Sequence, residues 1–363
     1  MIHVVIGTKA QLIKMAPILY YLQQRNIPYN YISTGQHKAK IDDILTNFGL
    51  RQPDYALCEA DDITSIQKMM AWSVKIIWRT IRKKKEIFRG DKEGIVLVHG
   101  DTLSTLLGAI MGRIAGLKIG HVESGLRSFD LFQPFPEEIT RLMTFSLAHY
   151  YFCPDDRAIQ NLKRYRGEKI NTVANTLYDS LRLSNHFPDV LSQSEIPSRQ
   201  YSIVSLHRHE NIYRQDALDR VMRLVEEISK THFLLFILHK PTEKKIHQFN
   251  WHQRLVENTN IEFRERYDYF GFIQLIKSAE FVISDGGSNQ EECYYMGKPI
   301  ILLRKVTERH DGLGENCLLS EYSIERIKEF ISTIDDHQFS FKELDVKPSE
   351  KIIESCLPFV KVY

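Results

Sequence analysis

Short apolar runs alternate with longer amphipathic stretches along most of the chain. The runs are nearly continuous in Val, Ile, Leu and Phe, and they occupy 2–6, 28–33, 95–99, 118–122, 149–153, 201–205, 233–238, 280–284 and 299–303. Stretches with helical spacing of apolar positions lie between them, at 11–25, 103–116, 139–148, 213–230 and 322–334. Continuous apolar strands separated by helices are typical of parallel sheets covered on both faces. Because the alternation restarts near residue 200, the pattern predicts an α/β protein with two doubly wound domains.

A polar segment with two prolines separates the halves. It covers 185–200 and contains Pro188 and Pro197, so we expect a hinge within 175–199. We expect a first domain over 1–180, a second over 181–345, and a final helical stretch within 346–363 that returns to the first domain. Ligands of doubly wound sheets bind at the C-terminal ends of the strands. The predicted site therefore lies in a cleft that the two domains face.

The amino-acid composition agrees with a globular α/β protein and argues against one class of binding partner. The 363 residues include 43% hydrophobic and 26% charged side chains, which is ordinary globular usage and argues against disorder, collagen or a disulfide scaffold. The 48 Lys and Arg nearly balance 46 Asp and Glu, for a net charge of +2. A balanced charge argues against a whole-protein polyanion binder, so no nucleic-acid partner is expected.

Sequence features that relate to cellular location predict a cytoplasmic protein without stable membrane insertion. The apolar start, 2–6, is too short for a secretory core and lacks a basic leader. Nowhere do about 18 apolar residues follow one another without interruption, as a membrane span requires. The five cysteines are scattered without a CxxC pair, so we expect buried reduced thiols rather than a metal site or a disulfide framework.

One basic and aromatic run, 75–85, has helical spacing. It could rest on an anionic membrane or bind nucleic acid. The favoured interpretation is a solvated helix face whose Trp78 and Ile side chains point into the core.

Three carboxylates follow predicted strands in the first half. Asp101 comes after 95–99, Glu123 after 118–122, and Glu137 opens a helix after a proline-rich loop. Clustered carboxylates raise one another's pKa, which suits proton transfer near neutral pH. Each has a plainer interpretation: Asp101 as a helix N-cap, Glu123 as a partner of Arg127, and Glu137 as a charge complementing a helix dipole.

The turn at Gly7, before a helix that carries Lys14, offers backbone N–H groups to an anion. A simple strand–helix turn remains the alternative for this segment.

The second half carries candidate phosphate-binding groups. His207, Arg208 and His209 follow strand 201–205, and with no further ligand at zinc spacing they favour a cationic pocket over a metal.

The strongest local signal is 284–292, where Gly286 and Gly287 precede a helix N-terminus that would attract a diphosphate. Glu292, one turn into that helix, could accept hydrogen bonds from sugar hydroxyls, and Arg309 could complete the anion site.

Taken together, these segments resemble the non-hydrolysing UDP-N-acetylglucosamine 2-epimerase family over most of the chain. That family's blocks G-T-R-P-E-x-I-K-M-A-P, G-D-T-x-T, H-V-E-A-G-L-R, P-W-P-E-E-x-N-R, H-R-R-E-N and D-S-G-G-I-Q-E-E are similar, in the same order, to residues 7–17, 100–105, 121–127, 134–141, 207–211 and 285–292. Its G-K-P and T-E-R segments are similar to 297–299 and 307–309.

The resemblance implies two Rossmann-like domains arranged as in GT-B glycosyltransferases, and a cofactor-free inversion at C2 of a UDP-hexosamine for surface polysaccharide. The family reaction eliminates UDP to a glycal and adds it back after protonation from the other face. The carried-over catalytic residues are Asp101, Glu123, Glu137 and His207. The carried-over or adjoining substrate contacts are Lys9, Lys14, Arg127, Arg208, Phe272, Gly286, Gly287, Ser288, Glu292 and Arg309. The resemblance also implies a homodimer.

The chain departs from the family pattern at the predicted site. R-P-E becomes 9–11 (Lys-Ala-Gln), A-G-L-R begins with Ser124, and D-S-G-G becomes Asp-Gly-Gly-Ser at 285–288. The sugar of the UDP-hexosamine is therefore left open, as is control by substrate through Gln36 and His37. A UDP-releasing epimerase, a GT-B glycosyltransferase on the same scaffold and a nucleotide-sugar sensor remain alternatives.

Overall fold

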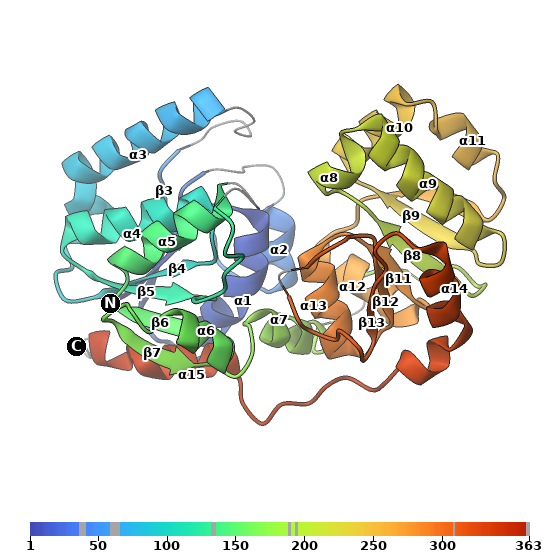
Figure 1. Ribbon diagram of the computed structural model, residues 1–363. Helices are drawn as coiled ribbons and strands as arrows, with labels where there is room; N and C mark the ends of the chain where they lie inside the picture. Colours follow the sequence, from blue (N-terminus) through green and yellow to red (C-terminus); the bar gives the residue numbers. More distant parts are fainter. Residues whose placement is uncertain are drawn as a thin grey trace. The chain divides into compact units, whose positions relative to one another are not determined.

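A computed structural model describes residues 1–35, 41–58, 66–131, 136–187, 190–192, 195–307 and 309–360 (Figure 1). The chain forms two compact units. The first is Met1–Phe187 with Leu344–Tyr363, and the second is Pro188–Glu343. Each unit is a parallel sheet with helices on both faces.

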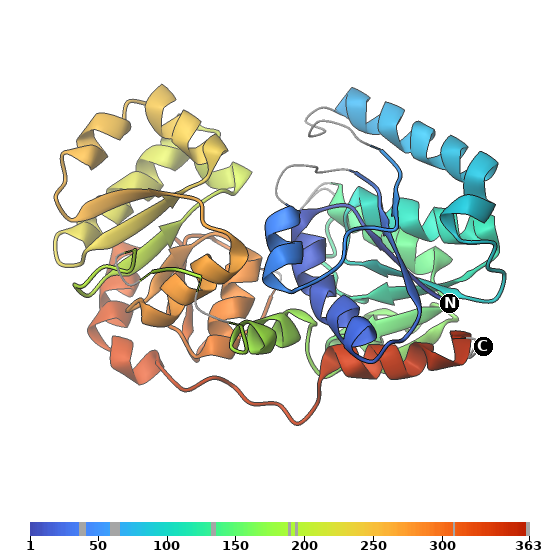
Figure 2. The same ribbon diagram turned by 180° about the vertical axis from the view of Figure 1, so that it is seen from behind.

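The first unit contains a seven-stranded parallel sheet in the order β3-β2-β1-β4-β5-β6-β7. Its strands are β1 (Ile2–Ile6), β2 (Tyr29–Ser33), β3 (Tyr55–Ala56), β4 (Ile95–His99), β5 (Lys118–Val122), β6 (Tyr150–Cys153) and β7 (Glu168–Asn171). Its helices are α1 (Lys9–Gln24), α2 (Asp42–Asn47), α3 (Ile66–Ile87), α4 (Leu103–Ala115), α5 (Glu137–Leu147), α6 (Asp156–Asn161), α7 (Leu177–Ser184) and α15 (Pro348–Cys356), followed by the 3-10 turn η2 (Leu357–Phe359). Helix α4 packs between α3 and α5 on one face, and α1 packs against α7 and α15 on the other (Figures 1 and 2).

The second unit repeats this plan with six parallel strands in the order β10-β9-β8-β11-β12-β13. Its strands are β8 (Ser202–Ser205), β9 (Leu234–Leu238), β10 (Ile261–Glu265), β11 (Val282–Ser284), β12 (Ile300–Leu302) and β13 (Cys317–Leu319). Its helices are α8 (His209–Ile212), α9 (Gln215–Ser229), α10 (Lys240–Gln248), α11 (His252–Val256), α12 (Tyr269–Ser278), α13 (Gly287–Met296) and α14 (Ile324–Ser332), with the 3-10 turn η1 (Ile334–His337). Counted from the first strand of each unit, the second sheet runs 3-2-1-4-5-6, the order of the Rossmann fold, and the first sheet has the same order with a seventh strand added at its end. The predicted fold class is therefore confirmed.

All nine predicted strands are present, and the four missed ones, β3, β7, β10 and β13, are the edges of the two sheets. An edge strand is covered less completely than a central one, so its sequence is not a continuous apolar run. Strand β7 shows this best, since it reads Glu-Lys-Ile-Asn and no residue in it is fully buried.

Two contacts tie the C-terminal segment to α7 within the first unit. The Leu344 N–H donates to the Tyr178 hydroxyl at 2.8 Å, and the Ser349 N–H donates to Asp179 Oδ2 at 2.6 Å. Helix α7 in turn packs against α1. The first unit thus continues through α7 to Phe187 and resumes at Leu344, where the sequence had placed boundaries at 180 and 345.

Helix α3 contradicts part of the expectation for the basic run 75–85. Trp78 is 54% exposed and Ile81 59% exposed, whereas Trp72 and Ile76 are buried. At about 100° per residue, positions 72 and 76 lie on one side of a helix and 78 and 81 on the other. The core therefore takes the first pair, and the prediction that Trp78 points inward is wrong.

All five cysteines are buried and none forms a disulfide. Within the ranges given above, no helix has the length and apolarity to cross a membrane.

Candidate functional site

In the first unit, chemistry-bearing residues follow the C-terminal ends of the neighbouring strands β4 and β5. The two strands pair in parallel with His99 opposite Val122, so the segments that begin at Gly100 and Glu123 leave the sheet side by side. In sheets with this strand order, ligands bind outside the C-terminal ends of the strands where the order reverses, which is here between β1 and β4.

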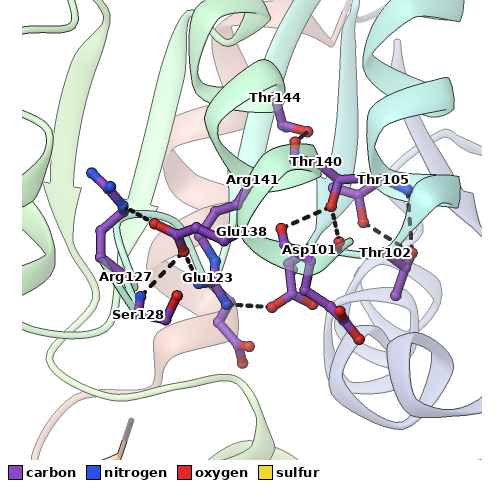
Figure 3. Close-up of polar contacts among 12 residues, drawn as sticks. Asp101, Thr102, Thr105, Glu123, Arg127, Ser128, Glu138, Thr140, Arg141 and Thr144 are labelled. Carbon is purple, nitrogen blue, oxygen red and sulfur yellow. Dashed lines mark hydrogen bonds and ion pairs between the residues drawn. The ribbon is translucent and has the colours of Figure 1, made fainter. Parts of the chain in front are cut away.

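Asp101 is held by two contacts from α5. Arg141 Nη2 donates to Asp101 Oδ2, and the Thr140 hydroxyl donates to the Asp101 carbonyl (Figure 3). The N-cap of α4 is Thr102, whose Oγ1 accepts from the Thr105 N–H at 3.3 Å. The N-cap interpretation of Asp101 is therefore wrong, and its carboxylate faces a guanidinium instead.

Arg141 joins Asp101 to a second, fully buried carboxylate, Glu138. Arg141 Nη1 lies 2.7 Å from Glu138 Oε2, the Ser128 N–H donates to the same oxygen at 3.1 Å, and Arg127 Nε donates to Oε1 (Figure 3). Burial alone would raise the pKa of Glu138, but the hydrogen bonds from Arg127 and Ser128 and the charges of both arginines outweigh it, and the pKa is lowered. Arg127 thus pairs with Glu138, not with Glu123 as the alternative interpretation had it. Glu137, beside it, opens α5.

Glu123 has a left-handed backbone, with φ of +60°, directly after β5. Lys14 Nζ from α1 and Asn175 Nδ2 both donate to its Oε2, and His99 Nε2 lies 3.7 Å from the same atom. Such a conformation is uncommon outside glycine and persists where the surroundings fix it. Lys14, though a lysine, is almost fully buried.

His121, in β5, holds the backbone next to Asp101. Its Nε2 lies 2.7 Å from the Gly100 carbonyl and its Nδ1 3.0 Å from the Ser124 hydroxyl. A carbonyl can only accept, so Nε2 carries the hydrogen and Nδ1 accepts from Ser124. Burial lowers the pKa of His121 to about 4, so the ring is neutral at pH 7. The Gly100 carbonyl therefore fixes this tautomer, and Ser124, a departure from the family pattern, supplies the donor to Nδ1.

Gln11, another departure, closes the turn that precedes α1. Its Oε1 accepts from the Gly7 and Thr8 N–H groups at 2.9 and 3.2 Å, and its Nε2 donates to the His99 carbonyl at 2.8 Å. These two N–H groups are thus occupied by the protein itself, as in a capping box, which supports the plainer interpretation of this turn. Lys9, beside it, forms an ion pair with Asp43 at 2.9 Å.

In the second unit the arrangement centres on Asp285, a fully buried carboxylate after β11. It accepts from the backbone N–H groups of His207 and Arg208 and from Asn211 Nδ2, each at 3.0 Å. Asn211 is fixed by the Tyr322 hydroxyl, which donates to its Oδ1 at 2.8 Å. Asp285 therefore fixes the loop after β8 against the loop after β11.

The glycines that start α13 keep space for the cations around them. A Cβ on Gly286 would lie 2.9 Å from His207 Cε1, and a Cβ on Gly287 would lie 3.2 Å from Arg309 Nε and 3.7 Å from Arg208 Nη2. Three basic side chains thus surround a helix N-terminus, which is an arrangement that attracts a phosphate.

Two buried glutamates of α13 have partners within the protein. Arg309 Nη1 lies 2.7 Å from Glu291 Oε2, and Glu292 Oε2 accepts from Asn289 Nδ2 at 2.9 Å. Ser288 is exposed in the first turn of the same helix. Phe272 is half-buried in α12.

The His207 side chain is 39% exposed, and its Nδ1 lies 3.5 Å from Asp285 Oδ1. Desolvation lowers its pKa below 6.5 despite the opposing effect of Asp285. The ring of His239 stacks on it at a centroid distance of 4.8 Å.

The structure thus brings Lys14, Asp101 and Glu123 together at the C-terminal ends of the central strands of the first unit, next to the start of α5. It brings His207, Arg208 and Arg309 to the glycine pair of the second. Sequence reasoning missed Glu138, Arg141, Asn175, Asp285 and Asn211. The i, i+3 spacing of Glu138 and Arg141 was the one available signal for a pair. The predictions for Gln36, His37, Pro134 and Phe135 lie outside the described residues.

Within the described part of the chain, no three His, Cys, Asp or Glu side chains are grouped so that they could hold a metal ion.

Comparison with known proteins gives one consistent result. Residues 21–353 match the family model for UDP-N-acetylglucosamine 2-epimerase. A protein of that name from Methanocaldococcus jannaschii is 31% identical over 90% of this chain and 90% of its own length. One from Bacillus subtilis is 28% identical over 97% of this chain and 94% of its own length.

Solved structures agree. The chain is similar to a UDP-GlcNAc 2-epimerase from Neisseria meningitidis bound to UDP-GlcNAc, with a TM-score of 0.83, 26% identity and coverage of 98% and 99% of the two chains. It is also similar to the Methanocaldococcus jannaschii enzyme in complex with UDP-GlcNAc and UDP, with a TM-score of 0.82, 26% identity and the same coverage.

Proposed function

The chain belongs to the UDP-N-acetylglucosamine 2-epimerase family, and from this premise we propose that it inverts C2 of UDP-N-acetylglucosamine or a closely related UDP-hexosamine. The observation that carries the proposal is the pair of carboxylates, Asp101 and Glu123, that follow adjacent strands and are each held by a buried cation. Positioned carboxylates of this kind suit proton transfer to and from carbon.

The reaction needs two proton-transfer groups and a holder for the leaving group. One carboxylate takes the C2 proton while the C1–oxygen bond breaks and UDP departs, which leaves a glycal. UDP then adds back to C1, and the other group delivers a proton to the opposite face of C2. We propose that Asp101, Glu123 and Glu137 supply these groups, with Lys14 near the reacting centre.

The leaving UDP carries negative charge throughout. We propose that His207, Arg208, Arg309 and the N-terminus of α13 hold its diphosphate, because the three basic side chains surround that helix end. Phe272 would pack against the uracil. Among the remaining predicted contacts, Lys9, Arg127 and Glu292 have polar partners within the protein that also fit structural roles, and Ser288 is exposed.

Incubation with UDP-GlcNAc in deuterated water tests the proposal. The expected result is deuterium at C2 of both epimers with UDP still attached. Proton NMR detects it as the loss of the C2 proton signal. Free UDP with a labelled sugar would identify a UDP-releasing epimerase. Unlabelled, intact UDP-GlcNAc would exclude it as the substrate, and the same result with related UDP-hexosamines would contradict the proposal. Sugar transfer to an acceptor would favour the glycosyltransferase alternative.

We also propose a homodimer that uses the exposed face of α3. Met70, Val74, Trp78 and Ile81 recur at helical spacing and are each more than half exposed, and an apolar stripe of this kind marks an interaction surface. Sedimentation equilibrium should give twice the chain mass for the wild type and the chain mass for Trp78→Glu. Val256→Glu, at an exposed apolar position of the second unit, is the matched control. A monomeric wild type would contradict this.

The five buried, unpaired cysteines fit a reducing compartment, and we propose a cytoplasmic location, with the epimer used for surface polysaccharide. Fractionation of the native host would test the location.

A further inference from the structure

Asn175 reaches the Glu123 carboxylate from a distant part of the chain. It lies in the loop between β7 and α7, and the sheet order places β6 between β7 and β5. The loop therefore crosses the end of β6 to bring Asn175 Nδ2 to Glu123 Oε2, 52 residues away in sequence. Asn175 is only 4% exposed.

The orientation of the Asn175 amide is determined by its second contact. Its Oδ1 accepts from the Leu177 N–H at 3.2 Å. A backbone N–H can only donate, so the oxygen faces Leu177 and the NH₂ group faces Glu123. Asn175 therefore acts as a donor to Glu123, which requires an acceptor there.

The loop that carries Asn175 is held in a strained form. Val173 has φ of +70°, an outlier for a β-branched residue, and its side chain is 48% exposed. Its N–H donates to Asn171 Oδ1 at 2.7 Å, and the Thr172 hydroxyl lies 2.9 Å from the Cys153 carbonyl. Strained backbone persists only where its surroundings fix it, and it concentrates at functional sites.

Glu123 Oε2 has two donors of different charge. Lys14 is cationic and Asn175 is neutral, and both reach the same oxygen. Two donors from different elements fix the position of this oxygen. A neutral second donor does this without adding another positive charge, which would hold the carboxylate ionised and weaken it as a proton acceptor.

We propose that Asn175 is a positioning residue for proton transfer by Glu123. This inference rests on the proposed epimerase function. Asn175 does not exchange the proton itself: it holds Oε2 so that the carboxylate is presented in one orientation to the reacting carbon. Misplacement of a catalytic group by about 1 Å costs roughly 100-fold in rate.

The first test is the kinetics of Asn175→Ala and Asn175→Asp in the full chain. Asn175→Ala should lower kcat by about 10- to 100-fold, with KM and the Kd for UDP changed by less than about twofold. Asn175→Asp places a carboxylate next to Glu123 and should move the acidic limb of the kcat–pH profile to higher pH. Asn185→Ala, the exposed C-cap of α7, is the control and should match the wild type.

A second test does not depend on turnover. With ¹³C-labelled glutamate, the Glu123 carboxyl signal is identified by its loss in Glu123→Gln. Its titration should shift to higher pH in Asn175→Asp, because of the added negative charge. It should also shift to higher pH in Asn175→Ala, because a donor to the ionised carboxylate is lost.

The two tests separate the inference from the function on which it rests. An active wild type with unchanged kcat, pH profile and Glu123 titration in both variants would overturn the inference alone. Loss of C2 exchange in the wild type would overturn the function, while the titration would still decide whether Asn175 holds Glu123. A fall in kcat of the Asn175 variants that only parallels a fall in their melting temperature would also overturn the inference that Asn175 positions Glu123.

Discussion

The two units share one strand order and use it in opposite ways. In the first, side chains at the sheet edge are fixed by ion pairs: Asp101 by Arg141, and Glu123 by Lys14. In the second, the buried carboxylate Asp285 fixes backbone, and the basic side chains His207, Arg208 and Arg309 surround a pair of glycines.

The difference follows from what each edge is proposed to do. A group that exchanges a proton with carbon must point in one direction, so its donors are buried and numerous. A diphosphate must enter and leave, so its site needs open space and partly exposed basic side chains, and the His207 side chain is 39% exposed. The same topology thus supports rigidly held side chains at the strand ends of the first unit and accessible side chains at the strand ends of the second.

The largest effect should come from removing the proton-transfer groups. Asp101→Asn or Glu123→Gln should lower C2 deuterium exchange by about 10²- to 10⁴-fold while UDP binding is kept, because the second unit is proposed to hold UDP. Proton NMR and calorimetric UDP titration measure the two effects. Wild-type exchange in either variant would contradict the acid–base assignment.

Breaking the buried network of the first unit should come next. Glu138→Ala removes the shared partner of Arg127 and Arg141, so that Arg127 loses this ion pair and the buried Arg141 keeps Asp101 but loses Glu138, at a cost of about 3–5 kcal/mol in the free energy of unfolding. Urea denaturation would measure the cost. Glu137→Ala is the neighbouring comparison for stability, and an equal loss in both variants would argue against the network.

Asp179 sharpens the contrast, because it is a buried carboxylate of the same unit whose contact is a backbone N–H. Burial raises its pKa to about 6, although the hydrogen bonds from Ser349 oppose this. Its contribution to stability is therefore fully present below pH 3.8 and is lost as the pH rises through about 6, for about 3 kcal/mol in total.

Asp179→Asn should flatten this part of the stability–pH curve, measured by urea denaturation between pH 4 and 7. Identical slopes in the variant and the wild type would show that Asp179 does not titrate in this window.

The accessible edge should show a smaller pH effect. The pKa of His207 is lowered below 6.5 by desolvation, so the free protein holds a neutral ring at pH 7. A bound diphosphate would raise that pKa, so affinity should increase as the pH falls, by less than about tenfold per pH unit. UDP-GlcNAc is the better probe, because the terminal phosphate of UDP titrates near pH 6. The dependence should vanish in His207→Gln, and its persistence there would assign it to another group.

The smallest effect is expected at the strained loop. Val173→Gly should relieve the left-handed backbone and change the free energy of unfolding by about 1 kcal/mol or less, because glycine also gains freedom in the unfolded chain. Thermal unfolding of the variant would measure this. A large destabilisation would mean that the Val173 side chain contributes packing despite its exposure.

The sequence predicted the central strands, the doubly wound fold and the family, because buried parallel strands are continuous apolar runs and the family blocks are ordered along the chain. It did not predict edge strands such as β7, whose polar sequence is compatible with solvent. It also misjudged Trp78, because spacing alone does not say which side of an amphipathic helix meets the sheet.

Within the site, the strands that precede Asp101 and Glu123 could be read from the sequence, but their partners could not. Asn175 is 52 positions from Glu123, and Arg141 is 40 positions from Asp101. Such pairs depend on the order of strands in the sheet, which no local pattern contains. The roles of these residues in turnover remain predictions.

Strand β7 has a consequence for how this protein tolerates change. As an edge strand with a polar sequence, its register against β6 is set by few side chains. A one-residue insertion in the turn at 163–167 that slid β7 along β6 would leave the sheet intact but would carry Asn175, which follows β7, away from Glu123. We therefore expect an insertion of this kind to impair turnover through the register of β7 rather than through folding.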